Sequence, residues 1–229
     1  MREYDVTGNN TSIDVKPVVL AGGRSKRFGG DKLFYTIDGK PLIKYTIESV
    51  EKTFNTKPIV IASPGNVKKI KKIDPKLEIH IDKQLGGPIT GVLKALEIHD
   101  KVMVFGGDMP CIRSDLVHEI LSRTLLGYTV VVPGWRNGYV EPLHAYYSRQ
   151  AEPYLRRLYL QGMRSLSQAV RLIPGTLIVL IDDYPLYMKL SLYNVNTMKD
   201  LECLKEGVAK QLRDPCLNCL AWIKKIYGI

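Results

Sequence analysis

The stretch that decides the fold is VVLAGGRSKRFGGDK, residues 18–32. It begins with four consecutive apolar residues, at positions 18–21, and such a run is typical of a strand buried on both faces of a sheet. Gly22 and Gly23 follow directly, and paired glycines let the backbone turn sharply with positive φ while leaving its amides accessible to a ligand. We therefore expect a buried strand that ends in a glycine turn.

The loop after this strand concentrates positive charge. Its cations are Arg24, Lys26, Arg27 and Lys32. Successive backbone amides in a glycine turn form a concave anion site, and basic side chains add charge to it. The alternative is a solvated basic turn after a core strand, but such turns seldom place so many cations directly behind paired glycines. The loop therefore predicts a phosphate-binding site.

The spacing of the glycines excludes two familiar phosphate-binding loops. A P-loop requires G-x-x-x-x-G-K-[ST], whereas Lys32 follows Asp31 and precedes Leu33. The dinucleotide-binding fingerprint requires G-x-G-x-x-G, which neither of the glycine pairs at 22–23 and 29–30 supplies. The predicted phosphate site is therefore of a different kind.

Outward from this stretch, short apolar runs alternate with amphipathic segments. The runs at 58–62, 77–81 and 102–105 predict strands. Helices are expected to begin near Pro41 and Pro88, because a proline costs nothing in the first helical turn. This alternation predicts a single α/β domain built on a doubly wound, mostly parallel sheet.

Ligands of such a sheet bind outside the carboxyl ends of its strands. The loop at residues 22–32, Asp82 and Asp108 each follow an apolar run directly, so they should meet at one edge of the sheet. Asp108 stands in Gly-Gly-Asp-Met-Pro, residues 106–110. A carboxylate there suits Mg²⁺, which takes one or two protein carboxylates and completes its shell with phosphate oxygens and water. The alternative role for Asp108 is to cap the helix that follows.

The second half of the chain is less regular. Ser114 is expected to be the N-cap of a helix through residue 125, and residues 140–147 have extended character. The other expected elements are strands at 129–132 and 177–181 and helices ending near 160, at 164–172 and at 197–205. The chain divides into a polar leader (1–16), one domain (17–206) and a C-terminal helical extension (207–229).

Composition limits the classes of function. The 229 residues carry a net charge of +10, which suits an anionic small molecule or reflects only a surface rich in Lys and Arg. Nucleic acid is not expected, because the cations form no helical stripe interleaved with aromatics. No apolar run reaches the roughly 20 residues of a membrane span. The leader has no signal-peptide core, so we expect a cytoplasmic protein.

The four cysteines give only a weak indication. Cys216 and Cys219 form a C-x-x-C, but no second such pair completes a zinc site. Two buried thiols, or a disulfide between Cys203 and one of this pair, are equally admissible. Their spacing assigns neither a metal nor a redox role.

Several motifs together resemble those of the molybdenum cofactor guanylyltransferases. LAGGRSKRFGGDK (20–32) is similar to the family's L-A-G-G-x-S-x-R-x-G-x-D-K, and GDMP (107–110) matches the family's G-D-M-P. GPITG (87–91) resembles the family's G-P-L-A-G. EPLHAYY (141–147) and NVNT (194–197) resemble the family's E-P-L-x-A-x-Y and N-x-N-T segments.

The resemblance implies a Rossmann-like fold of the nucleotide-diphospho-sugar transferase type and gives roles to individual residues. The glycine loop would wrap the triphosphate of a nucleotide, with Arg27 and Lys32 neutralising its charge and Asp108 holding Mg²⁺. The implied nucleotide-binding residues are Leu20, Ala21, Gly22, Gly23, Arg24, Ser25, Lys32, Asp82, Gly87 and Pro88. The residues implied to face the acceptor are Glu141, Asn194 and Asn196. The two asparagines equally suit a turn before the next helix, and Thr90 stands where the family has a small apolar residue.

The reaction implied is transfer of GMP from GTP to the terminal phosphate of molybdopterin, with release of pyrophosphate. Similar proteins transfer CMP to methylerythritol phosphate or molybdopterin, or GMP to cobinamide phosphate, and these reactions remain alternatives. A non-catalytic nucleotide-binding protein is another, although it would be expected to lose Asp108 or Lys32. The resemblance also points to molybdoenzyme-maturation proteins as partners, and we expect a monomer or a weak homo-oligomer.

Overall fold

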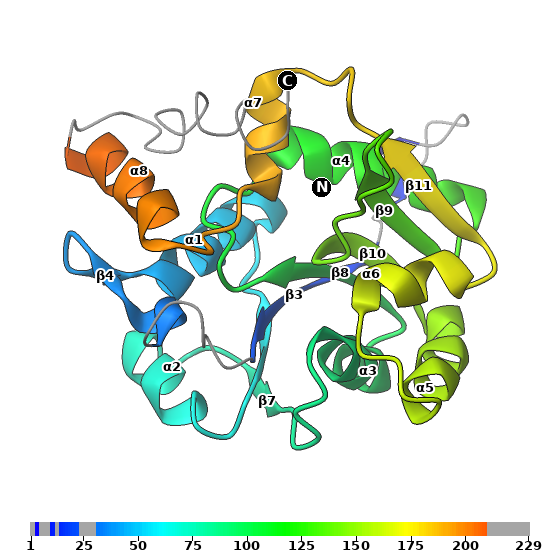
Figure 1. Ribbon diagram of the computed structural model, residues 1–229, viewed down its shortest axis with the longest axis horizontal. Coiled ribbons are helices and arrows are strands. Elements are labelled where there is room, and N and C mark those ends of the chain that lie inside the picture. Colours follow the sequence, from blue (N-terminus) through cyan, green and yellow to red (C-terminus); the bar gives the residue numbers. More distant parts are fainter. Residues whose placement is uncertain (1–2, 5–9, 12–13, 23–30, 210–229) are drawn as a thin grey trace.

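The computed structural model describes residues 3–4, 10–11, 14–22 and 31–209. Its centre is a β-sheet with helices on both faces (Figure 1). The strands of this sheet are β3 (Lys16–Ala21), β6 (Ile59–Ala62), β7 (Ile79–Ile81), β8 (Lys101–Gly106), β9 (Val130–Gly134), β10 (His144–Ser148) and β11 (Thr176–Leu180). Among the described residues the sheet is seven-stranded, in the order β11-β9-β10-β8-β3-β6-β7. Only β10 runs antiparallel to its neighbours, so the prediction of a mostly parallel α/β sheet is confirmed.

The strand β3 lies inside the sheet and is buried on both faces, as its apolar run predicts. Val18 and Leu20 pack into one core with helices α3 (Pro88–Ile98) and α5 (Glu152–Leu160). Val19 packs into the opposite core with α1 (Leu42–Phe54) and α4 (Ser114–Arg123). Successive side chains of a strand point to opposite faces, so one short run of sequence contributes to both cores.

The remaining elements lie around this framework. The other α-helices are α2 (Val67–Ile73), α6 (Leu166–Ala169), α7 (Leu186–Lys189) and α8 (Met198–Ala209). The 3₁₀ turns are η2 (Lys32–Phe34), η3 (Thr124–Leu126), η4 (Arg149–Ala151), η5 (Val170–Leu172) and η6 (Leu190–Leu192). Two small antiparallel sheets pair β1 (Glu3–Tyr4) with β2 (Asn10–Thr11), and β4 (Thr36–Ile37) with β5 (Lys40–Pro41).

The predicted N-cap of α4 is wrong. Arg113 occupies that position, with φ −114° and ψ 128°, and Ser114 is the first residue of the helix. The backbone N–H of Arg113 donates to Ser191 Oγ at 2.9 Å. A residue distant in sequence thus binds beside the start of this helix, and no local pattern could indicate it.

The expectation for the cysteines also needs correction. Cys111 forms a disulfide, whereas Cys203 is in the thiol form, so the alternative in which Cys203 is disulfide-bonded is wrong. Cys111 is buried against Leu201 and Leu204 of α8, a contact that the spacing of cysteines cannot reveal. The C-x-x-C and most of the expected C-terminal helix lie outside the described residues. No helix in the described part of the chain is long and apolar enough to cross a membrane.

Candidate active site

A cavity of about 840 Å³ lies along the carboxyl ends of four adjacent strands. Gly22 follows β3, residues 63–65 follow β6, Asp82 follows β7, and Asp108 follows β8, and all of them line the cavity. The chain proceeds from β3 to β6 and β7 on one side and then to β8 on the other. Ligands of doubly wound sheets bind at such a topological switch point. The predicted meeting of the strand ends is confirmed.

The cavity contains most of the described residues that we expected to bind nucleotide. Those that line it are Leu20, Gly22, Lys32, Asp82, Gly87 and Pro88, and the expected metal ligand Asp108 lines it too. Ala21 is buried, and its carbonyl oxygen accepts from Asn66 Nδ2 at 2.9 Å. Four expected residues, Gly23, Arg24, Ser25 and Arg27, lie outside the described part of the chain.

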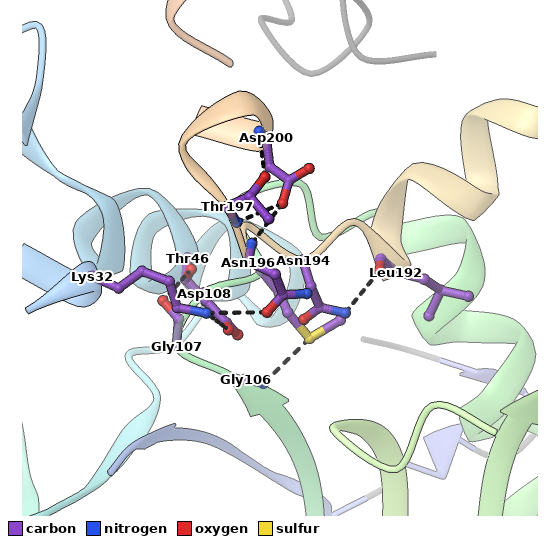
Figure 2. A network of polar contacts seen from close by, with 11 residues as sticks. Lys32, Thr46, Gly106, Gly107, Asp108, Leu192, Asn194, Asn196, Thr197 and Asp200 are labelled. Carbon is purple, nitrogen blue, oxygen red and sulfur yellow. Dashed lines mark hydrogen bonds and ion pairs between the residues drawn. The ribbon is translucent and has the colours of Figure 1, made fainter. Parts of the chain in front are cut away.

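Lys32 joins two segments that are far apart in sequence (Figure 2). Its Nζ donates to Asp108 Oδ2 at 2.5 Å and to Asn196 Oδ1 at 3.2 Å. The Lys32 and Asp108 side chains are 12% and 20% exposed, so the ion pair is shielded from solvent but remains reachable from the cavity. These contacts place a cation, a carboxylate and an amide together near the ends of β3 and β8.

Backbone hydrogen bonds hold Asp108 at this place. The Gly107 N–H donates to Leu20 O at 3.0 Å, which attaches the turn after β8 to the end of β3. Thr46 Oγ1, from α1, donates to Gly107 O at 3.0 Å. The Val195 N–H donates to Asp108 O at 3.0 Å. The turn is thus fixed from three sides.

A reciprocal cap positions Asn196. The Asp200 carboxylate, buried at the start of α8, accepts from the N–H groups of Asn196 and Thr197 at 2.8 Å each. Thr197 Oγ1 in turn accepts from the Asp200 N–H at 3.3 Å. Such reciprocal capping fixes the entry of the chain into a helix, and here it directs Asn196 toward Lys32. This role of Asp200 was not predicted, although its three-residue spacing from Thr197 is a signal of such a cap.

The fold and this geometry agree with the comparisons to known proteins. The family model of the MobA-like NTP transferase domain matches residues 17–173. The chain belongs to the MobA-like NTP transferases. As a member of this family it is an enzyme, a nucleotidyltransferase, and the strand-end cavity is its candidate active site.

Known proteins of similar sequence align with most of this MobA-like transferase. A probable molybdenum cofactor guanylyltransferase of Thermococcus gammatolerans is 42% identical over 191 residues, which are 82% of this chain and 98% of that protein. A protein of the same description from Pyrococcus horikoshii is 38% identical over 187 residues, 81% of this chain and 96% of its own length. The crystal structure of molybdopterin-guanine dinucleotide biosynthesis protein A from Archaeoglobus fulgidus superposes with a TM-score of 0.72 at 26% identity, covering 86% of this chain and 100% of that one.

The residues expected to face an acceptor lie less close to the cavity of this MobA-like transferase than those expected to bind nucleotide. Leu143, which precedes β10, lines the cavity, whereas Glu141 and Asn194 are not among the described residues that line it. Asn194 Nδ2 donates to Leu192 O at 3.1 Å, a local bond of the turn before α8. Asn196 contacts Lys32 instead. A role for these three residues toward an acceptor stays a prediction.

The buried histidine next to the site has a structural position. His144 is fully buried, and its Nε2 lies 2.6 Å from Ser191 Oγ. Burial lowers the pKa of His144 to about 4, so its ring is neutral at pH 7. It links β10 to the η6 turn that precedes Asn194, so its role is structural.

The described residues show which groups could hold a metal ion. No group of three or more His, Cys, Asp or Glu side chains with metal-binding geometry occurs among them. The Asp108 carboxylate and the Asn196 amide oxygen are the oxygen atoms around Lys32 Nζ. This sparse, hard-oxygen set fits Mg²⁺, which binds few protein groups when a substrate phosphate supplies the others.

Proposed function

We propose that this nucleotidyltransferase is a molybdenum cofactor guanylyltransferase, which transfers GMP from GTP to the terminal phosphate of molybdopterin and forms molybdopterin guanine dinucleotide. The observation that carries the proposal is the Lys32–Asp108 ion pair, which lies with Gly22 and Gly107 in the cavity at the switch point of the sheet. The choice of donor and acceptor rests on the relatives, which are described as molybdenum cofactor guanylyltransferases.

The reaction joins an acceptor phosphate oxygen to the α-phosphorus of GTP. The bond between that phosphorus and the oxygen bridging to the β-phosphate breaks, so pyrophosphate leaves with the bonding electrons. The acceptor phosphate is already largely ionised at pH 7, and the step therefore needs no strong general base. The protein must instead position two anions and neutralise charge that builds up on them.

The described residues divide this work. Lys32 would donate from its ammonium group to phosphate oxygens, and the N–H of Gly22 would bind the triphosphate at the end of β3. Asp108, with the amide oxygen of Asn196, would hold Mg²⁺. When bound, Mg²⁺ supplies positive charge that polarises the phosphates. Arg27, on the loop outside the described residues, would add a second cation.

The acceptor would enter on the side of β8 and β10, where Leu143 lines the cavity. Glu141, Asn194 and Asn196 are the residues proposed to face it. The proposal includes a cytoplasmic location and transfer of the product to molybdoenzyme-maturation proteins.

A panel assay tests the proposal. Pyrophosphate release is measured with GTP, CTP and ATP, each with molybdopterin, methylerythritol phosphate or cobinamide phosphate, in the presence and absence of Mg²⁺. We expect release only with GTP, molybdopterin and Mg²⁺ together. Turnover with CTP, or with one of the other acceptors, would assign the protein to a different transferase reaction. Nucleotide binding without release in any combination would identify a non-catalytic protein.

A further inference from the structure

The loop between β7 and α3 has an unfavourable backbone conformation at the edge of the cavity. Leu85 has a φ of +51° and Gly87 a φ of +82°. Left-handed backbone is unfavourable for leucine and persists only where neighbouring groups hold it. The Leu85 side chain is 56% exposed and lines the cavity, so burial of its side chain does not account for the conformation.

Thr90 holds this loop together from the first turn of α3. Its hydroxyl donates to Asp82 Oδ2 at 2.6 Å and accepts from the Gly86 N–H at 3.1 Å. The other carboxylate oxygen, Asp82 Oδ1, accepts from the Gln84 N–H at 2.9 Å. Thr90 is only 2% exposed, so its hydroxyl is largely shielded from water, whereas the bond between Gln84 and Asp82 is exposed. The residues on both sides of Leu85 are therefore fixed by one threonine and one aspartate.

Close packing supports the same arrangement. A Cβ atom placed on Gly86 would lie 2.5 Å from Tyr159 Oη and 2.6 Å from Thr90 Cγ2. The backbone of Gly86 is thus enclosed between α5 and α3. The loop cannot move toward the helices, and the Asp82–Thr90 bond keeps it from moving away.

This loop lies at the opposite end of the cavity from Asp108. The strands β8, β3, β6 and β7 are successive neighbours. At about 4.8 Å per strand, the ends of β8 and β7 are roughly 14 Å apart. A nucleotide whose phosphates lie at β3 and β8 therefore directs its base toward β6 and β7. Ile61, Pro64 and Leu85 provide apolar lining there.

We propose that Thr90 is a positioning residue for the nucleobase of the donor. Through its hydrogen bonds with Asp82 and Gly86, it holds Leu85 in place, so that the leucine side chain forms one wall of the base-binding end of the cavity. In this arrangement Asp82 contributes to base binding by accepting the hydrogen bond that orients the Thr90 hydroxyl. The inference rests on the proposed function, because it assumes a nucleoside triphosphate donor bound along this edge.

Thr90→Val tests the inference, because valine keeps the shape of threonine and removes the hydroxyl. The KM for GTP should rise about tenfold, as expected for a buried polar group left without its partner. The kcat at saturating GTP should stay within about twofold of the parent, because the change affects binding of the base and not the reacting phosphates. Thr90→Ser keeps the hydroxyl and should restore the KM for GTP.

Two controls separate positioning from a general loss of structure. Inhibition by pyrophosphate, which occupies only the phosphate end, should be the same for Thr90→Val and the parent. Thr176→Val removes a hydroxyl of β11, at the other edge of the sheet, that bonds the backbone carbonyls of Val170 and Ile173. It should leave the KM for GTP unchanged. The double variant Thr90→Val with Asp82→Ala should be no worse than the more severe single variant, because each change removes the hydrogen bond between Thr90 and Asp82.

An unchanged KM for GTP in Thr90→Val would overturn the inference, and so would an equal loss of affinity for GTP and pyrophosphate. If Thr90→Val does not fold, Thr90→Ser and Asp82→Ala decide, since only Asp82→Ala removes the hydrogen bond and should weaken GTP binding. A parent protein that binds GTP but releases no pyrophosphate would refute the proposed function alone. The thermal shift with GTP would then measure the effect of Thr90 on binding directly.

Discussion

Lys32 is held by polar contacts of its ammonium group. Its Nζ lies between Asp108 Oδ2 and Asn196 Oδ1, at 2.5 and 3.2 Å. A ligand phosphate at the end of β3 could replace either contact, because Lys32 and Asp108 both line the cavity. The residue is therefore suited to exchange partners during a reaction.

Lys32→Ala should reduce turnover far more than stability. Losing one charged donor to a transition state typically costs about 10²–10³-fold in kcat. The protein should still fold without ligand, because Lys32 lines the cavity at the edge of the sheet. Steady-state kinetics and thermal unfolding of the two proteins measure this, with Lys32→Arg as a variant that keeps the charge. A kcat within a few-fold of the parent would show that Lys32 is only a surface cation.

His144 predicts a dependence of stability on pH. Burial lowers its pKa to about 4 in the folded protein, against 6.5 for the free side chain. The unfolded chain therefore binds the proton more readily between these values. Stability from the neutral ring is complete above pH 6.5 and is lost as the pH falls toward 4, with a total of about 3 kcal/mol.

Urea unfolding of the parent and of His144→Gln between pH 4 and 7 measures this contribution. Most other titrating groups are common to both proteins, so the difference between the two curves isolates the histidine. The difference should change by about 3 kcal/mol across this range, although glutamine itself lowers stability at every pH. Parallel curves would mean that His144 is accessible to protons in the folded state.

The contact between the elements β3 and β8 depends on Gly107. A Cβ atom there would lie 2.9 Å from the backbone oxygen of Leu20, and a backbone atom cannot move aside as a flexible side chain can. Gly107→Ala should therefore separate the two strand ends, lower the free energy of unfolding by about 1–3 kcal/mol and displace Asp108. Denaturant unfolding and kcat together test this.

Gly65→Ala is the matched control for stability, because a Cβ there meets nothing within 4 Å. Its free energy of unfolding should equal or slightly exceed that of the parent, since alanine restricts the unfolded chain. If Gly107→Ala were as stable and as active as the parent, close approach of the strand ends would not be needed to place Asp108.

The elements around the phosphate loop could be predicted because their patterns are local. The apolar runs at 58–62 and 102–105 correspond to β6 and β8, and Pro88 begins α3 as expected. The antiparallel direction of β10 could not be predicted, since all residues from His144 to Tyr147 are buried and their pattern specifies no partner. A turn, closed by the His144 N–H and Glu141 O at 3.0 Å, also shortens the extended segment expected at 140–147.

The site residues that directly follow a strand could be predicted from the sequence. Asp82 and Asp108 could be placed at one edge because parallel strands end together. The residues that position these two aspartates could not be predicted. Thr46 bonds Gly107, which is 61 residues away in sequence, and the bonds of Thr90 depend on the path of the loop before α3. The sequence shows that Thr90 stands where the family has a small apolar residue. It does not show that the Thr90 hydroxyl bonds Asp82.

At the scale of the whole molecule, the order of the strands determines where the chemistry occurs. The strand β3 lies between β8 and β6, and the cavity follows the ends of these strands to β7. One edge thus presents a cation and a carboxylate at one end and apolar side chains at the other. The net charge of +10 favours the approach of anionic molecules to the protein as a whole.

The central claim is that Asp108 binds Mg²⁺ against the triphosphate, and Asp108→Asn tests it most directly. Asparagine keeps the shape and would serve almost equally well if the residue only capped a helix. Pyrophosphate release is measured against Mg²⁺ concentration for both proteins. If Asp108 holds Mg²⁺, Asp108→Asn should be nearly inactive at every Mg²⁺ concentration, because charge on the reacting phosphates is no longer compensated. Superimposable curves for the two proteins would contradict it.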